Sequence, residues 1–309
     1  VTSTSSTSKR HAGTTMAIIA SPPPMPSPMP SLTTTAVVTG ASRGLGLAIV
    51  RQLLHLRNPG VRVVLAARTP EAANGAAAAL QREGYENVCG YALDVCNPRS
   101  VAEISAAIGH VDLLINNAAI CPVAWTPASA NLCWRTNVLG PLALTQAVLP
   151  GMLRRRRGHV VHISSGDGEL AYLNTALQAA LQDATSDRDV LRTLARAAPP
   201  RNTFGSAPAH GPTPAYSTSK AALNALTRLT AARLPPPEAG GVLVSAVCPG
   251  DVATRMLSTH DPEAVRQALP PAAAARDVVT HAMAGLCMDS AKAAMPSGRF
   301  WRHGTQLEF

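Results

Sequence analysis

The chain has 309 residues, a formal net charge of +9, and a hydrophobic content of 46% with only 3% aromatic residues. This length suits one large α/β domain with additions. Because aromatic residues are few, Ala, Val, Leu and Ile must fill the core of this domain. No stretch reaches the ~18 uninterrupted apolar residues of a membrane-spanning helix, which excludes a membrane span and predicts a soluble protein.

The positive charge does not by itself indicate a nucleic-acid partner. The one dense basic run, Arg154 to Arg157, has no interleaved aromatic residues and fits the solvated end of a helix. The six cysteines form no CxxC pair, and the nine histidines form no HExxH motif or Cys/His cluster. These patterns predict reduced thiols in an intracellular compartment, no nucleic-acid binding and no metal site.

Residues 1–34 differ in composition from the rest of the chain. They are rich in Ser, Thr and Pro, and the first acidic residue of the whole sequence is Glu71. This composition is typical of an organelle transit peptide, and a disordered tail without an address fits it as well. The chain begins with Val1, and Met16 is an alternative start. We expect a domain over 35–309, in the cytoplasm or in an organelle such as the plastid.

From residue 35 onward, short apolar segments alternate with longer helical ones. The expected strands cover 35–40, 61–68, 87–95, 111–119, 158–165 and 241–250. The expected helices cover 43–56, 70–84, 98–109, 136–153 and 216–234. This alternation predicts right-handed βαβ units and a single doubly wound, Rossmann-type α/β domain with a parallel sheet.

The first expected strand runs into its helix through a glycine-rich turn. Its spacing is G-x-x-x-G-x-G, and glycine lets backbone N–H groups approach a pyrophosphate at a helix N-terminus. Glycines that serve only close strand–helix packing are the alternative. The residues expected to contact a dinucleotide here are Gly40, Ser42, Arg43, Gly44, Leu45 and Gly46.

The second expected strand ends at Arg68. NAD sites carry an acidic residue near this position for the ribose 2′-hydroxyl, whereas an arginine suits a 2′-phosphate. Arg43 can supply a second cation, although two solvated surface arginines would give the same pattern. The sequence therefore predicts NADP(H), used as NADPH, in preference to NAD(H).

Together, residues 35–309 resemble the short-chain dehydrogenase/reductase family. The stretch TGASRGLG is similar to its TGxxxGxG cofactor turn, and NNAA resembles its NNAG motif, with Ala119 in place of the glycine. LDV, TNVLG, ISS, YSTSK and CPGDVAT resemble further motifs in the family's order. The resemblance implies further cofactor contacts by Asp94, Val95, Asn117, Tyr216, Lys220, Pro249, Gly250, Val252 and Thr254.

The resemblance also implies a set of catalytic residues. Tyr216 would exchange the proton, and Ser165, the second residue of the pair Ser164/Ser165, would hydrogen-bond the substrate carbonyl. Lys220, one helical turn from Tyr216, would favour the phenolate and bind the nicotinamide ribose. Asn137 would hold a water molecule that links Lys220 to solvent. Taken alone, a Tyr–Lys pair at this spacing is a surface contact.

The expected catalytic serine and tyrosine are separated by a long insertion, 166–214. Its leucines recur at three- and four-residue intervals, which predicts amphipathic helices. This insertion resembles that of the carbonyl reductase subgroup, whose members are commonly monomeric because the segment covers an oligomerisation surface. A surface loop without such a role is the alternative.

The expected activity is the NADPH-dependent reduction of a ketone, aldehyde or quinone, which are small-molecule substrates, by a monomeric enzyme. An NADP-linked dehydrogenase that oxidises a steroid, terpenoid or retinoid alcohol is the first alternative. A noncatalytic dinucleotide-binding regulator is the second, and the intact Ser165, Tyr216 and Lys220 argue against it. A fold-level resemblance does not name the substrate.

Overall fold

The structure is a computed structural model that describes residues 32–56, 60–197, 213–236, 239, 241–286 and 295–308. The transit peptide or tail predicted for 1–34 lies almost wholly outside the described residues. Among the helices of the described part, none is both long enough and apolar enough to cross a membrane.

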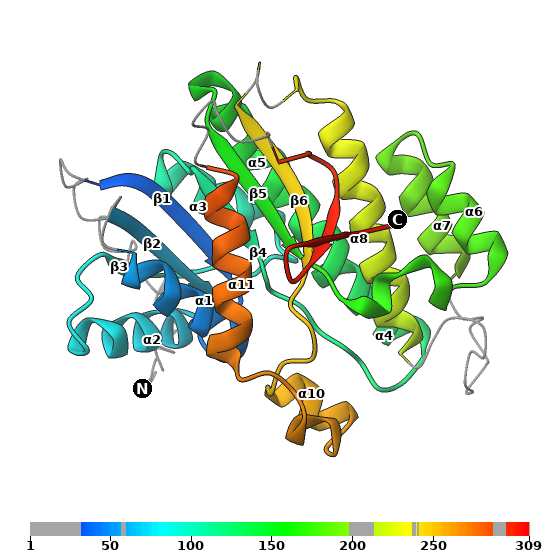
Figure 1. Cartoon of the computed structure of the whole chain (residues 1–309), viewed down its shortest axis with the longest axis horizontal. Coiled ribbons are helices and arrows are strands. Elements are labelled where there is room, and N and C mark those ends of the chain that lie inside the picture. Colours follow the sequence, from blue (N-terminus) through cyan, green and yellow to red (C-terminus); the bar gives the residue numbers. More distant parts are fainter. Residues whose placement is uncertain are drawn as a thin grey trace, which may run out of the picture.

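One eight-stranded sheet forms the centre of the molecule, with the strand order β3-β2-β1-β4-β5-β6-β7-β8 (Figure 1). The strands are β1 (Leu32–Thr39), β2 (Gly60–Ala67), β3 (Val88–Ala92), β4 (Leu113–Asn116), β5 (Gly158–Ile163), β6 (Val242–Cys248), β7 (Phe300–Arg302) and β8 (Thr305–Leu307). Strands β1 to β7 pair in parallel, which confirms the predicted doubly wound sheet. The strand order reverses between β1 and β4, where such sheets bind their ligands.

Helices cover both faces of the sheet (Figure 1). On one face α1 (Gly44–His55), α2 (Pro70–Arg82) and α11 (Pro271–Ala284) close a core of small and branched aliphatic side chains. On the other face α3 (Pro98–Ile108) and α5 (Gly140–Arg155) close a second core, and α8 (Pro214–Ala232) lies beside them. Every residue of β4, β5 and β6 is buried, as expected for parallel strands between two helical layers.

The insertion forms the predicted helices, as α6 (Thr175–Gln182) and α7 (Asp187–Ala197). Leu181, Val190 and Leu194 pack on α8 in a third hydrophobic core, at the side of the molecule away from β1 (Figure 1). The Arg228 guanidinium of α8 donates to three carbonyl oxygens at the end of α6, over 3.1–3.2 Å. The insertion therefore covers the outer surface of α8, while residues 198–212 lie outside the described part.

The helix predicted over 136–153 differs from the observed structure. A separate helix, α4 (Pro127–Trp134), precedes it and begins with a capping box between Thr126 and Ser129. A π-helical turn, η1 (Arg135–Leu139), then leads into α5. Pro141 has no N–H to donate to the carbonyl of Asn137, so the regular α-helical pattern breaks there, and Gly140 N–H instead reaches the Arg135 carbonyl.

The C-terminal part contains elements that the alternating pattern did not predict. The short helix α10 (Arg255–His260) follows β6, and α11 then packs on α1. Strand β8 pairs antiparallel with β7 through the two-residue turn His303–Gly304, in which both residues have positive φ, 48° and 75°. A turn of this type fits the twist of a hairpin, so the sheet ends in one antiparallel edge strand.

Candidate active site

The glycine-rich turn after β1 is packed too tightly for larger residues. A Cβ on Gly40 would lie 2.8 Å from Ala118 Cα, and one on Gly46 would lie 2.5 Å from the Gly40 carbonyl oxygen. Gly40 and Gly44 have positive φ, 63° and 57°. The turn thus needs glycine both for its backbone conformation and for its close approach to the end of β4.

The N-terminus of α1 is open to a ligand. Arg43 is its N-cap residue and makes no side-chain capping hydrogen bond, and the first turn of the helix carries no acidic residue. The first backbone N–H groups therefore remain available for an anion, with the helix dipole in support. Arg43 and Arg68 are both exposed, and within the residues that the structure describes neither guanidinium forms an ion pair.

Three further predicted cofactor residues lie at the ends of β3 and β4. The Asp94 carboxylate accepts a hydrogen bond from Cys96 N–H, 2.9 Å, and Val95 packs against Gly140. The Asn117 side-chain amide donates to the carbonyl oxygens of Thr39, 2.8 Å, and of Gly40. Asn117 is thus engaged with the glycine turn itself, which it ties to the end of β4.

Ser165, Tyr216 and Lys220 come together at the end of β5. The Ser165 hydroxyl and the Tyr216 phenol share a hydrogen bond. Lys220 Nζ lies 5.3 Å from the centre of the Tyr216 ring and donates to the Ile163 carbonyl oxygen over 2.6 Å. The two side chains that were spaced as a surface pair therefore lie against the sheet, and only 2% of Lys220 is exposed.

Burial controls the protonation of this pair. It raises the pKa of the Tyr216 phenol far above its usual range, whereas the hydrogen bond with Ser165 acts in the opposite direction. It lowers the pKa of Lys220 to about 8. The pKa of the phenol, expected to be lowered beside Lys220, is raised in this structure because loss of solvent has the largest effect on it. The neutral phenol is the form present at pH 7.

Asn137 lies in the π-helical turn η1 and is 1% exposed. Its Oδ1 accepts from Ile120 N–H, 2.9 Å, and its Nδ2 donates to the Ile120 carbonyl, 2.8 Å, and to Ser219 Oγ, 3.0 Å. Ser219 in turn donates to the Tyr216 carbonyl over 2.7 Å. Asn137 therefore connects the loop after β4 with the helix of Tyr216, and its part in a water relay stays a prediction.

The loop after β6 reaches back over the glycine turn. Thr254 Cγ2 lies 3.5 Å from the position of a Cβ on Gly44, and Val252 is 92% buried, with 8% exposed. Gly250 has φ of 74°, which suits the sharp turn that follows Pro249. The predicted residues after β6 and those after β1 thus border one space at the carboxyl ends of the strands.

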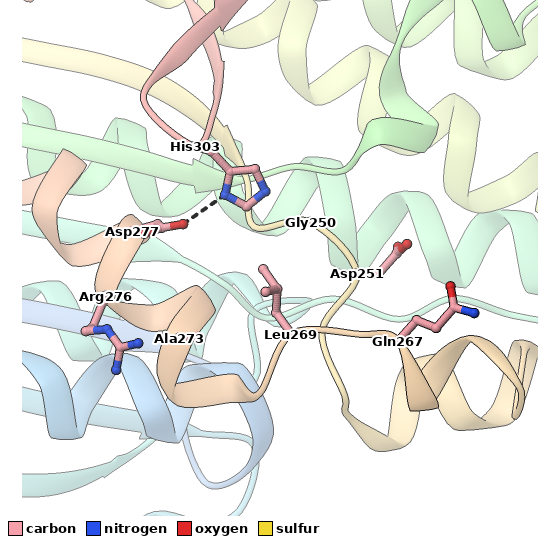
Figure 2. A pocket seen from close by; sticks show the side chains of 8 residues that line it. All are labelled: Gly250, Asp251, Gln267, Leu269, Ala273, Arg276, Asp277 and His303. Atoms are coloured by element: carbon pink, nitrogen blue, oxygen red, sulfur yellow. Dashed lines mark hydrogen bonds and ion pairs between the residues drawn. The ribbon is translucent and has the colours of Figure 1, made fainter.

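A separate cavity of about 380 Å³ borders the same loop (Figure 2). Gly250 and Asp251 line it together with Leu269, and the His303 imidazole forms an ion pair with Asp277 at its edge, 2.8 Å. Its lining does not include Ser165, Tyr216 or Lys220. This hollow is therefore distinct from the catalytic grouping.

Sequence patterns missed three residues near the catalytic pair: Cys121, Asp167 and His260. His260 Nε2 lies 2.7 Å from the Cys121 carbonyl oxygen, which joins α10 to the loop after β4. Burial raises the pKa of the Cys121 thiol to about 12. Asp167 is the one acidic residue between Asp112 and Glu169. This isolation is the only feature of the sequence that could have pointed to a role for it.

This arrangement of sheet, glycine turn and Ser–Tyr–Lys grouping defines a dinucleotide-dependent oxidoreductase. The model of the short chain dehydrogenase family matches residues 34–184 and 206–264, and the chain belongs to this family. It is 38% identical over 162 residues to dehydrogenase/reductase SDR family member 7B from Bos taurus, a match that covers 48% of this chain but only 49% of that relative.

Longer matches reach relatives with reductase names. The chain is 30% identical to salutaridine reductase from Papaver bracteatum, over 75% of its own length and 87% of the relative. It is 31% identical to carbonyl reductase [NADPH] 1 from Mus musculus, with 76% and 88% covered. The solved structure of NADPH-bound carbonyl reductase from chicken fatty liver superposes with a TM-score of 0.65 at 25% identity, covering 90% of this chain and 100% of that one.

Proposed function

We propose that the chain is an NADPH-dependent carbonyl reductase that converts a ketone, aldehyde or quinone to the alcohol. The observation that carries this proposal is the grouping at the end of β5 of the buried Lys220 with Ser165 and Tyr216, which are both partly exposed. A protonated phenol paired with a serine hydroxyl suits the donation of a proton to a carbonyl oxygen. The raised pKa of Tyr216 keeps the phenol protonated at pH 7, which is the form that donates a proton to a carbonyl oxygen.

Each of the three side chains has a separate task in this reaction. Tyr216 gives its proton to the carbonyl oxygen as negative charge develops there. The Ser165 hydroxyl hydrogen-bonds the same oxygen and keeps it beside the phenol. Lys220, still mostly protonated at pH 7 with a pKa of about 8, stabilises the phenolate that remains.

The residues around the glycine turn fit a bound NADPH. The uncapped start of α1 and the close-packed Gly40 and Gly46 leave backbone N–H groups free to hold a pyrophosphate. Arg43 and Arg68 would hold the 2′-phosphate, and an acidic partner for a 2′-hydroxyl is not found at the end of β2. When bound, NADPH supplies the hydride, so the side chains need supply only the proton and the positioning.

The insertion supports a monomer. Helices α6 and α7 cover α8 with Leu181, Val190 and Leu194, so this surface is not free for a second copy. For residues 1–34, composition supports either a transit peptide or a disordered tail.

A panel of carbonyl compounds tests the proposed function. The full chain is incubated with NADPH, and in parallel with NADH, and with quinones, diketones and aromatic aldehydes, while nicotinamide absorbance is followed. We expect oxidation of NADPH with at least one compound and slower oxidation of NADH. The absence of turnover with every compound, in a chain that binds NADPH, would contradict a general carbonyl reductase.

A further inference from the structure

Asp167 lies two residues after Ser165, in the 3-10 turn η2 (Gly166–Gly168) that opens the insertion. Its backbone N–H donates to Ser165 Oγ over 3.2 Å. Its carboxylate Oδ2 accepts a hydrogen bond from Thr213 Oγ1 over 3.1 Å. Thr213 immediately precedes α8 and stands three residues before Tyr216. One side-chain hydrogen bond therefore joins the two segments that carry the serine and the tyrosine.

Thr213 occupies the N-cap position of α8 but does not cap the helix. An N-cap threonine ordinarily accepts a hydrogen bond from a backbone N–H of the first helical turn. Thr213 makes no such bond, and its hydroxyl donates to Asp167 instead. The helix thus forgoes a side-chain cap, and the hydroxyl serves the contact between the two ends of the insertion.

The turn that carries Asp167 is also pressed against α8 further along. A Cβ on Gly168 would lie 2.8 Å from Lys220 Cβ, so only glycine fits there. Asn224 Nδ2, one helical turn beyond Lys220, donates to the Gly168 carbonyl over 3.3 Å. The turn therefore contacts α8 at its beginning, at Lys220 and at Asn224, and these contacts fix the position of the helix along the end of β5.

Thr213 also contacts the loop after β4, which in turn contacts α10. The Thr213 side chain hydrogen-bonds the Cys121 thiol, and the Cys121 carbonyl oxygen meets His260 of α10 at 2.7 Å. Thr213 is thus connected through Cys121 to the loop after β4 and to the helix after β6.

We propose that Asp167 is a positioning residue whose hydrogen bond with Thr213 holds the start of α8 against the end of β5 and so sets the distance between the Ser165 hydroxyl and the Tyr216 phenol. This inference rests on the proposed reductase function. Without the bond, the contacts of the turn with Lys220 and Asn224 would remain, but none of them holds the first residues of α8. Small displacements of reacting groups lower catalytic rates by up to about a hundredfold.

The carboxylate also acts on the phenol through its charge. It is one of the groups that raise the pKa of Tyr216, after burial and the Cys121 thiol. The other charged or titratable groups that face Asp167 are Asp251, His260 and Arg302. Among these, Arg302 is paired with Glu169 at 2.7 Å. Removal of the Asp167 charge alone should therefore make the phenol easier to deprotonate.

The test compares variants of the full chain. Thr213→Val and Asp167→Ala each remove the hydrogen bond, and we expect kcat to fall by about tenfold to a hundredfold with the KM for NADPH unchanged within about twofold. Thr213→Ser keeps the hydroxyl and should stay within about threefold of the parent. The double variant should be no slower than the slower single one, because both changes break the same bond.

Two measurements separate positioning from a loss of stability. Asn174→Ala removes the side-chain cap of α6 in the same insertion, where Asn174 Oδ1 accepts from Leu177 N–H, and should lower stability while kcat is unchanged. Asp167→Asn keeps an acceptor oxygen but not the charge. It should retain most of the turnover and shift the pH profile of alcohol oxidation to lower pH by about half a unit or more.

Amide hydrogen exchange distinguishes this inference from the proposed function. Thr213→Val should accelerate exchange at residues 217–220, whose first member donates to the Thr213 carbonyl, whether or not the chain turns over a carbonyl compound. A parent without reductase activity but with this change in exchange would refute the proposed function alone. Multiplicative losses in the double variant, or a kcat of Thr213→Val equal to that of the parent, would overturn the positioning role.

Discussion

Two buried histidines and a third that is partly buried should make the stability of this protein strongly dependent on pH. His159 is fully buried, with Nδ1 donating to the Ala282 carbonyl over 2.9 Å and Nε2 placed 2.8 Å from Ser245 Oγ. His281 Nε2 contacts the same hydroxyl at 2.9 Å, and His162 Nδ1 lies 3.2 Å from Asn116 Nδ2. Every one of these hydrogen bonds can form with neutral imidazoles.

The magnitude follows from the pKa values. Burial lowers the pKa from 6.5 to about 4 for His159 and to about 3 for His162 and His281. As the pH falls below 6.5, the unfolded chain therefore takes up protons that the folded chain excludes, and stability falls until the folded values are reached. Between pH 7 and pH 5 each histidine costs about 2 kcal/mol, so three cost about 6 kcal/mol. This is comparable with the whole stability of many proteins.

Urea unfolding at pH 7 and pH 5 measures this loss. His162→Gln should reduce the difference between the two pH values by about 2 kcal/mol, because one of the three protonations is removed. The carboxylates also titrate between these pH values, but their contribution to the free energy of unfolding is the same in parent and variant. It therefore cancels when the pH-dependent changes of the two proteins are compared. His55→Gln, a change at an exposed imidazole that contacts Tyr85, serves as the matched control. An identical loss of stability in parent and His162→Gln would refute the reasoning.

Further predictions concern the cofactor site and the insertion. Arg68→Ala should raise the Kd for NADPH by about tenfold to a hundredfold and that for NADH by less than about threefold, as measured by fluorescence titration; an equal effect on both would remove the case for a 2′-phosphate contact. Gly46→Ala should weaken both cofactors and destabilise the fold by about 1–3 kcal/mol, since its Cβ would meet the Gly40 carbonyl at 2.5 Å; unaltered binding would show that the turn can relax. Sedimentation should find a monomer, and an obligate tetramer would contradict the covering role of α6 and α7.

Much of this architecture follows from local sequence patterns. Strands between two helical layers are mostly apolar, and the turn after β1 must contain glycine, so both are visible in sequence. The Thr126–Ser129 capping box is equally local and marks the start of α4, although α4 does not belong to the alternation of strands and helices. The interruption of the regular α-helix at η1 depends on Pro141. The spacing of apolar residues over 136–153 predicts a continuous helix and gives no sign of this interruption.

Other properties of the site arise only from packing. The pKa of Tyr216 depends on how much water the insertion and the loop after β4 exclude, and the spacing to Lys220 carries no information about that. The bond between Asp167 and Thr213 joins residues at opposite ends of a long insertion, beyond the reach of any periodic pattern. The antiparallel pairing of β8 likewise depends on the positive φ of His303, a conformation that is uncommon for residues other than glycine.

The most direct test of the proposed chemistry is Tyr216→Phe. This change removes the proton donor and keeps the ring beside Lys220, so we expect NADPH to bind with an unchanged Kd while turnover of a carbonyl substrate falls by more than about a hundredfold. Single-turnover measurement of NADPH oxidation at pH 7 gives both quantities in one experiment. Turnover that survives the substitution at the level of the parent would contradict the assignment of Tyr216 as the acid.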